Sequence, residues 1–217
     1  MEQTEIEQRE KLISDVEPID DSAAKLPMNE EQIKEIVEEP LQDAVLDLIK
    51  EKGIRTVSTS ANKNDIENGY GYIAVDYENL SQNNKRKLDK QGYKTVEYGQ
   101  KDRYKVVELK FQINKNTTVE EIKKEAQKIV NKFELQEPNW IKEYSVEDVM
   151  EIFSYKPEER ENFLKEAKEE KSSGYYFNQE TQKFYDSKWL HDIKMELNKK
   201  IKEITNTEIN ENLVHTS

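Results

Sequence analysis

The chain of 217 residues has no cysteine, only six glycines and only two histidines. The absence of cysteine excludes disulfides, thiolate zinc sites, iron–sulfur clusters and a cysteine nucleophile, and it fits a reducing compartment. No Walker loop and no Gly-x-Gly-x-x-Gly fingerprint occurs, so the sequence offers no phosphate-cradling loop. Two isolated histidines also give no zinc-ligand spacing, and we expect neither a cofactor nor a metal ion.

Long apolar runs are missing as well. No stretch approaches the roughly 20 apolar residues that a membrane-spanning helix requires. The residues from Met1 to Glu5 are acidic and precede no apolar segment, which is unlike a signal peptide. The sequence therefore predicts a cytoplasmic protein without a membrane partner.

Charge is abundant but unevenly placed. Charged residues make up 37% of the chain and hydrophobic residues 34%, so the core is small and part of the chain lies in tails or solvated helices. The net charge of −12 hides a basic centre: residues 81–132 contain 14 basic and 7 acidic side chains, whereas both flanks are acidic. Such segregation is typical of a surface that docks a charged partner.

The hydrophobic pattern divides the chain into four parts. Residues 1–27 are acidic, lack helical or strand periodicity, and are predicted to form a disordered arm. Residues 28–135 alternate helical and strand patterns in the order αββαββα, which predicts an α+β fold: a two-layer sandwich with a mostly antiparallel sheet. Residues 136–205 are predicted to form a helical extension with a β-hairpin at about 175–186, and residues 206–217 a frayed tail.

Three elements of the central domain carry the clearest signals. Leu41, Ala44, Val45, Leu48 and Ile49 form one helical stripe. In the second half, Thr118 and Glu121 form a capping box ahead of an amphipathic helix over residues 119–133, and residues 103–113 alternate as a half-buried strand does.

Catalytic residues are hard to assemble from this sequence. His191 has Asp192 beside it, but no nucleophile elbow supports a triad, and we interpret His191 as a surface residue. Paired carboxylates such as Asp43 and Asp47 lie on the polar sides of helices. The loop over residues 56–65 is rich in hydroxyls and amides and is the first place to look for a small-molecule site.

The basic centre is a candidate nucleic-acid surface, because single strands bind to basic side chains interleaved with aromatic stacking platforms. The same residues are candidates for binding a protein; alternatively, the acidic N-terminal arm covers them within the same molecule. The candidate binding residues are Lys85, Arg86, Lys87, Lys90, Lys101, Arg103, Lys105, Lys123, Lys124 and Lys128, with Tyr93, Tyr98 and Tyr104 among them.

Residues 175–186, YYFNQETQKFYD, place an aromatic pair on each side of a polar Asn-x-x-Thr turn. This pattern is similar to one hairpin of WW or octamer-repeat aromatic modules over about a dozen residues, although it lacks the leading tryptophan and trailing proline of a WW domain. The resemblance implies a hairpin whose exposed aromatics suit a peptide. The candidate peptide-binding residues are Tyr175, Tyr176, Phe177, Phe184, Tyr185 and Trp189; alternatively, these aromatics pack the hairpin onto the main domain.

Together these features favour a noncatalytic binding protein whose partner is another protein. Nucleic-acid binding through residues 85–132 is the first alternative. A hydrolase or transferase using carboxylates or a carboxylate-bound metal is the second, and it requires at least two converging carboxylates, or a carboxylate with His191, in one pocket.

Overall fold

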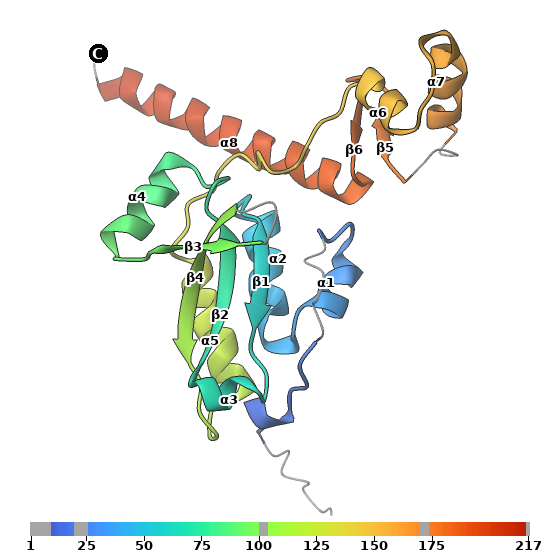
Figure 1. The fold of residues 1–217 in the computed structure, drawn as a ribbon. Helices are drawn as coiled ribbons and strands as arrows, with labels where there is room; N and C mark the ends of the chain where they lie inside the picture. The colour runs from blue at the N-terminus through green and yellow to red at the C-terminus, as the bar shows by residue number, and fades with distance from the viewer. Residues whose placement is uncertain (1–9, 20–25, 100–103, 170–173, 216–217) are drawn as a thin grey trace, which may run out of the picture.

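The computed structural model describes residues 10–19, 26–99, 104–169 and 174–215, and the side chains of the final helix as far as residue 207 (Figure 1). It shows an α+β fold with a four-stranded antiparallel sheet in the order β1-β2-β4-β3 and a small sheet of β5 and β6. The strands are β1 (Thr56–Ser60), β2 (Tyr70–Asp76), β3 (Thr95–Tyr98), β4 (Tyr104–Gln112), β5 (Tyr176–Asn178) and β6 (Lys183–Tyr185).

The helices of the first part are η1 (Ile13–Asp15), α1 (Glu30–Ile36), η2 (Glu39–Leu41), α2 (Gln42–Lys50), α3 (Asp65–Asn68), α4 (Gln82–Lys90) and α5 (Val119–Val130). With the short α3 inserted, the order from α2 to α5 is the predicted αββαββα. The remaining helices are α6 (Val146–Ile152), η3 (Pro157–Glu159), α7 (Arg160–Lys168) and α8 (Lys188–His215).

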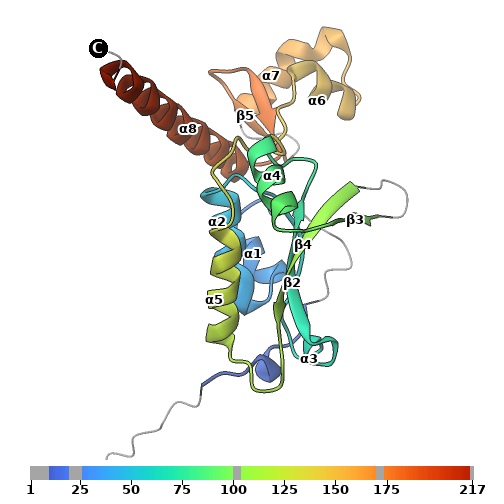
Figure 2. The same cartoon turned by 90° about the vertical axis from the view of Figure 1, so that its left-hand side faces the viewer.

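The main domain has two layers. Helices α2 and α5 lie on one face of the large sheet (Figure 2), and their predicted apolar stripes face it, with Leu48 and Ile122 fully buried. From the sheet, alternate residues such as Ile73, Val107 and Leu109 join the same core. Thr118 caps α5 as the sequence predicts, with both hydrogen bonds of the capping box formed.

The N-terminal arm is partly ordered, which corrects the prediction for residues 10–19. Ile13 is fully buried in the main core, and Leu12 forms an isolated antiparallel bridge with Thr118. The Ile13 N–H donates to the Thr117 carbonyl at 2.9 Å. The segment around Ile13 thus packs against the start of α5. Residues 1–9 and 20–25 lie outside the described residues.

The C-terminal unit, residues 144–187, comprises α6, η3, α7 and the β5–β6 hairpin. Phe177 and Phe184 point from the hairpin towards α6 and α7, where they join Val149 and Phe163 in a second, smaller core. The opposite side of the hairpin faces α8 and the main core, to which Tyr185 belongs. The hairpin is therefore the shared wall between two hydrophobic clusters.

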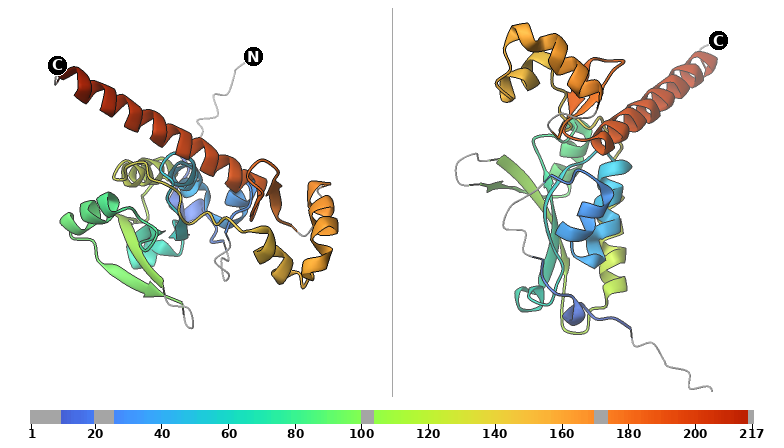
Figure 3. Two further views of the ribbon diagram at one scale, coloured as in Figure 1. Left: turned by 90° about the horizontal axis from the view of Figure 1, so that it is seen from above. Right: turned by 90° about the vertical axis from the view of Figure 1, so that its right-hand side faces the viewer.

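Helix α8 is longer than the sequence predicted. It was expected to end near Ile204 with a frayed tail after it, but it continues to His215 and extends beyond the rest of the molecule (Figure 3). No glycine or proline interrupts it, and the hydroxyls of Thr205 and Thr207 donate to carbonyls one turn back at 3.0 and 2.9 Å. Ile204 is half exposed, so helical order here continues past the buried stripe that ends at Leu197.

Across the ranges given above, every helix is too short or too polar to traverse a lipid bilayer.

Candidate functional site

The predicted basic residues do not form one surface. Lys87 of α4 pairs with Glu134 at 2.6 Å, so α4 lies against the C-terminal end of α5. In the other half of α5, Lys123 bonds to Glu120 and lies near Glu39, so its surroundings are acidic. Figure 2 shows α4 and the start of α5 at different ends of the domain.

The other members of the basic set are equally dispersed. Lys85 lies over the Tyr77 ring, Arg86 bonds within its own helix, and Lys128 pairs with Glu125. The remaining described members of the set have exposed side chains: Lys90 on α4, Lys124 on α5 and Lys105 on β4. Lys101 and Arg103 lie outside the described residues.

The three tyrosines of this set are not free platforms for stacking. Tyr93 packs against the main core, with Lys132 over its ring. Tyr98 and Tyr104 meet edge to face across β3 and β4, with ring centroids 6.4 Å apart. The Tyr98 hydroxyl donates to Glu108 at 2.6 Å, and burial together with this bond raises the pKa of Tyr98 far above its ordinary value.

The polar groups of the loop after β1 form hydrogen bonds with one another. Asp65 accepts hydrogen bonds from the Ser60 hydroxyl at 2.7 Å and from the Asn62 N–H at 2.9 Å. The Asn62 amide in turn donates to Glu38 at 2.9 Å. These hydrogen bonds hold the loop against α3, which is the local role that Ser, Asn and Asp side chains commonly have in loops.

The hairpin aromatics divide into two groups, which corrects the predicted peptide surface. Phe177, Phe184 and Tyr185 are at most 7% exposed because they fill the two cores on either side of the hairpin, and a peptide cannot contact their side chains. Tyr175, Tyr176 and Trp189 are all partly exposed, and each packs against one of the two cores. Tyr175 and Tyr176 also line the cavity described below. The candidate surface thus contracts to Tyr175 and Tyr176.

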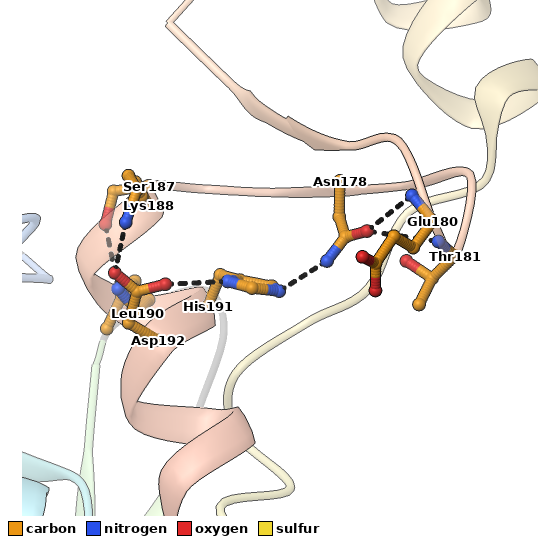
Figure 4. A network of polar contacts seen from close by, with 8 residues as sticks. All are labelled: Asn178, Glu180, Thr181, Ser187, Lys188, Leu190, His191 and Asp192. Atoms are coloured by element: carbon orange, nitrogen blue, oxygen red, sulfur yellow. Dashed lines mark hydrogen bonds and ion pairs between the residues drawn. The ribbon is translucent and has the colours of Figure 1, made fainter.

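His191 lies at the centre of a polar network rather than on the surface, which corrects a second prediction (Figure 4). It is 8% exposed and contacts the rings of Tyr176 and Tyr185, with centroids 5.0 and 4.8 Å away. Its Nδ1 lies 2.9 Å from Asp192, and its Nε2 lies 2.7 Å from the Asn178 amide nitrogen.

The hairpin turn fixes the tautomer of His191. The Asn178 side-chain oxygen accepts the N–H groups of Glu180 and Thr181 at 2.9 and 3.0 Å, so its amide nitrogen must face the histidine. Because that nitrogen only donates, Nε2 of His191 is the acceptor and Nδ1 carries the proton to Asp192. Burial alone would raise the pKa of Asp192, but hydrogen bonds from Lys188 and His191 outweigh it and lower that pKa.

This arrangement resembles a catalytic pair but lacks its reactive atom. A general base needs a free nitrogen within reach of a nucleophile, and here Asn178 occupies Nε2. The nearby Ser187 hydroxyl accepts the Leu190 N–H at the start of α8. In the part of the chain that the structure describes, no three His, Asp or Glu side chains converge as a metal site.

A cavity of about 810 Å³ opens beside this network. It lies between the end of α7, the hairpin and the first turn of α8, and its volume suits a small ligand or a few peptide residues. Its walls combine aromatic, amide and charged side chains from all three elements: Ala167, Lys168, Gly174, Tyr175, Tyr176, Phe177, Asn178, Gln179, Glu180, Ser187, Lys188 and His191.

Sequence reasoning found the hairpin but missed Lys168, Asn178 and Lys188 as parts of one site. Asn178 carried a signal, since an Asn-x-x-Thr turn predicts side-chain acceptance of backbone N–H groups. The two lysines carried none, because only the folding of α7 and α8 around the hairpin brings them to one cavity.

Comparisons of the chain with protein-family models, with curated proteins and with solved structures found no match.

Proposed function

We propose that this protein is a noncatalytic binding module that recognises a peptide segment of another protein in the cavity between α7, the β5–β6 hairpin and α8. The observation that carries the proposal is the cavity itself, in which Tyr175 and Tyr176 remain partly exposed beside Lys168 and Lys188. Tyrosine supplies a large contact area at small entropic cost, and amides and lysines at the rim supply orientation.

The chemistry of the walls favours binding over catalysis. His191 is held by partners on both ring nitrogens, and the Ser187 hydroxyl caps a helix. A nucleic-acid partner has weaker support, because the basic side chains are spread over both ends of the domain and several pair with glutamates. The cavity is the place where exposed aromatic and polar groups converge.

Site-specific photocrosslinking tests this proposal. A photoreactive phenylalanine analogue at Gln179, in the cavity wall, is expected to crosslink one protein species in an extract of the native cells. The same analogue at Lys124, exposed on α5, is the matched control and is expected to give no such species. The Tyr176→Ala substitution is expected to remove the crosslink from the Gln179 position.

Two results would contradict it. One is an equal crosslink from both positions, which would place the contact elsewhere or make it nonspecific. The other is crosslinking to RNA or DNA from Lys124 with nothing from Gln179, which would move the function to the basic segment.

A further inference from the structure

The hydrogen bonds of the hairpin show which edge of β5 is open. Tyr144 forms an isolated antiparallel bridge with Phe184, whose N–H and carbonyl both bond to Tyr144 at 2.9 Å. In an antiparallel pair, the main-chain groups of successive residues point alternately to one neighbour and then to the other. Because the groups of Phe184 point away from β5, its cross-strand partner Phe177 must point its own groups away from β6.

Phe177 therefore presents one N–H and one carbonyl at the outer edge of β5. Neither group has a hydrogen-bond partner among the described residues. The Phe177 residue is 7% exposed and lines the cavity, so this edge opens into the cavity and not onto open surface. An unpaired N–H and carbonyl at a strand edge are a template for a further strand, which favours an occupant whose main chain can pair with them.

We propose that β5 binds its partner by strand addition: an extended peptide enters the cavity and pairs with the main chain of Phe177. This inference rests on the proposed peptide-binding function and specifies how it works. The other edge of the small sheet is already closed by Tyr144, so β5 is the edge left for a third full strand. Strand addition draws affinity from main-chain hydrogen bonds and specificity from alternate side chains.

The walls also indicate the chemistry of the peptide. Two basic residues, Lys168 and Lys188, and one acidic residue, Glu180, line the cavity. Lys188 also pairs with Asp192, which leaves Lys168 at the end of α7 as the more available cation. Tyr176 lies between His191 and Lys188, with the lysine 5.9 Å from its ring centroid. The expected partner segment is extended and acidic, with an apolar side chain directed at Tyr176.

A displayed library of random dodecapeptides, selected against the full-length protein, provides the probe. A selected peptide is then resynthesised with one N-methyl group at each position in turn, because methylation removes a single main-chain donor. We expect binding to weaken roughly tenfold at the one position whose N–H pairs with the Phe177 carbonyl and to change little at the two neighbouring positions. We also expect the Phe177 amide to exchange at least about tenfold more slowly in the complex.

A matched pair of substitutions tests the charge. Lys168→Glu is expected to weaken the selected peptide about three- to tenfold, whereas Lys165→Glu, on the same helix outside the cavity, leaves binding unchanged. Equal effects of the two substitutions would overturn the acidic preference.

The outcomes separate the two proposals. Peptides that lose binding with Tyr176→Ala but tolerate every N-methyl group, or leave Phe177 exchange unchanged, would overturn strand addition and keep peptide binding. A selection that yields no peptide, or only peptides indifferent to Tyr176→Ala, would overturn both.

Discussion

The main domain and the C-terminal unit are built on very different amounts of buried apolar surface. The main core runs through both layers and draws on elements from Ile13 to Leu197. The core of the C-terminal unit consists of Val146, Val149, Met150, Phe163, Ala167, Phe177 and Phe184. Because stability scales with the area removed from water, the smaller cluster cannot support a fold alone and depends on the wall it shares with the larger one.

This difference explains where a binding site can form. The hairpin presents Phe177 and Phe184 to the small core and Tyr185 to the large one, so it is packed on both faces. Within the small sheet, β5 pairs only with β6. The proposed strand addition would use the outer edge of β5, which the packing on both faces holds in place.

Removal of the Phe184 ring is expected to have the largest effect on the stability of the C-terminal unit relative to the main domain. Phe184 is fully buried, with ring centroids 4.6 Å from Phe177 and 5.6 Å from Phe163. Phe184→Ala is expected to destabilise the C-terminal unit by about 3–5 kcal/mol through lost burial and a cavity. Hydrogen exchange measured by mass spectrometry should show protection lost over residues 144–187 and retained in β2 and β4.

An exposed neighbour gives the control for that experiment. Gln179→Ala in the hairpin turn is expected to change stability by less than about 0.5 kcal/mol. Simultaneous loss of protection in β2 and β4 in the Phe184→Ala variant would show instead that both regions unfold as one cooperative unit.

Gly53 contacts the segment that leads from α5 to the C-terminal unit, and its substitution tests how much this contact contributes to stability. Its φ is +70°, its carbonyl accepts the Trp140 indole N–H at 3.0 Å, and an added Cβ would lie 2.3 Å from the Gln136 carbonyl oxygen. Gly53→Ala is expected to cost about 1–3 kcal/mol from backbone strain, with the steric clash in addition. Urea denaturation should show the loss together with reduced near-ultraviolet circular dichroism from Trp140.

A substitution at Gly69 separates the cost of backbone strain from the cost of the steric clash. It also has a positive φ, +76°, but an added Cβ would meet nothing within 4 Å. Gly69→Ala should therefore lose only the strain component, and equal losses for the two variants would contradict the role assigned to the contact between Gly53 and Gln136.

Matched helix caps allow a finer comparison of the two regions. Thr118 caps α5 in the main domain and Ser145 caps α6 in the C-terminal unit, each in a complete capping box. Thr118→Ala and Ser145→Ala should each cost about 1 kcal/mol. Local hydrogen exchange should rise in α5 for the first variant and in α6 alone for the second; faster exchange in α5 after Ser145→Ala would contradict the separation.

The fold was largely predictable because its signals are local. Alternation in β4, the stripe of α2 and the Thr118 capping box each lie within a dozen residues, and each predicted its element correctly. The order of elements then favoured an antiparallel two-layer sandwich, which the structure has. The packing of Ile13 beside the start of α5 was not predictable, since the hydrogen bond between Ile13 and Thr117 joins segments about a hundred residues apart.

The site was predicted only in part, for the same physical reason. Tyr175 and Tyr176 were recognised from the aromatic pattern, but the pattern does not distinguish them from Phe177, Phe184 and Tyr185, which point into the cores. The role of His191 depends on Asn178, whose orientation is set by the turn that follows it. Likewise, the basic residues that cluster in the sequence over 85–132 do not share one surface, because α4 lies against only the C-terminal end of α5.

The smallest expected effect is a difference between the two regions in how their stability depends on pH. Burial raises the pKa of Glu38 in the main domain, against the opposing hydrogen bond from Asn62. Its contribution to stability is therefore complete below the unfolded pKa of about 4.5 and is lost as pH rises through the folded value. In the C-terminal unit, hydrogen bonds from Ser145 lower the pKa of Asp148, so that contribution is present above about 3.8 and is lost as pH falls.

Glu38→Gln isolates the first of these opposing trends. The amide keeps an acceptor for Asn62 but carries no charge to desolvate, so the variant should be more stable than the parent at pH 7. The difference in the free energy of unfolding, measured in urea at several pH values, should shrink as pH falls towards 4.5 and vanish below it. Asp148→Asn, with the amide replacing an acceptor that favours charge, should show the reverse sign at pH 7. A Glu38→Gln variant that is less stable at pH 7 would mean that the carboxylate is held in its charged form by its neighbours, and the contrast between a buried acid in one region and hydrogen-bonded surface acids in the other would fail.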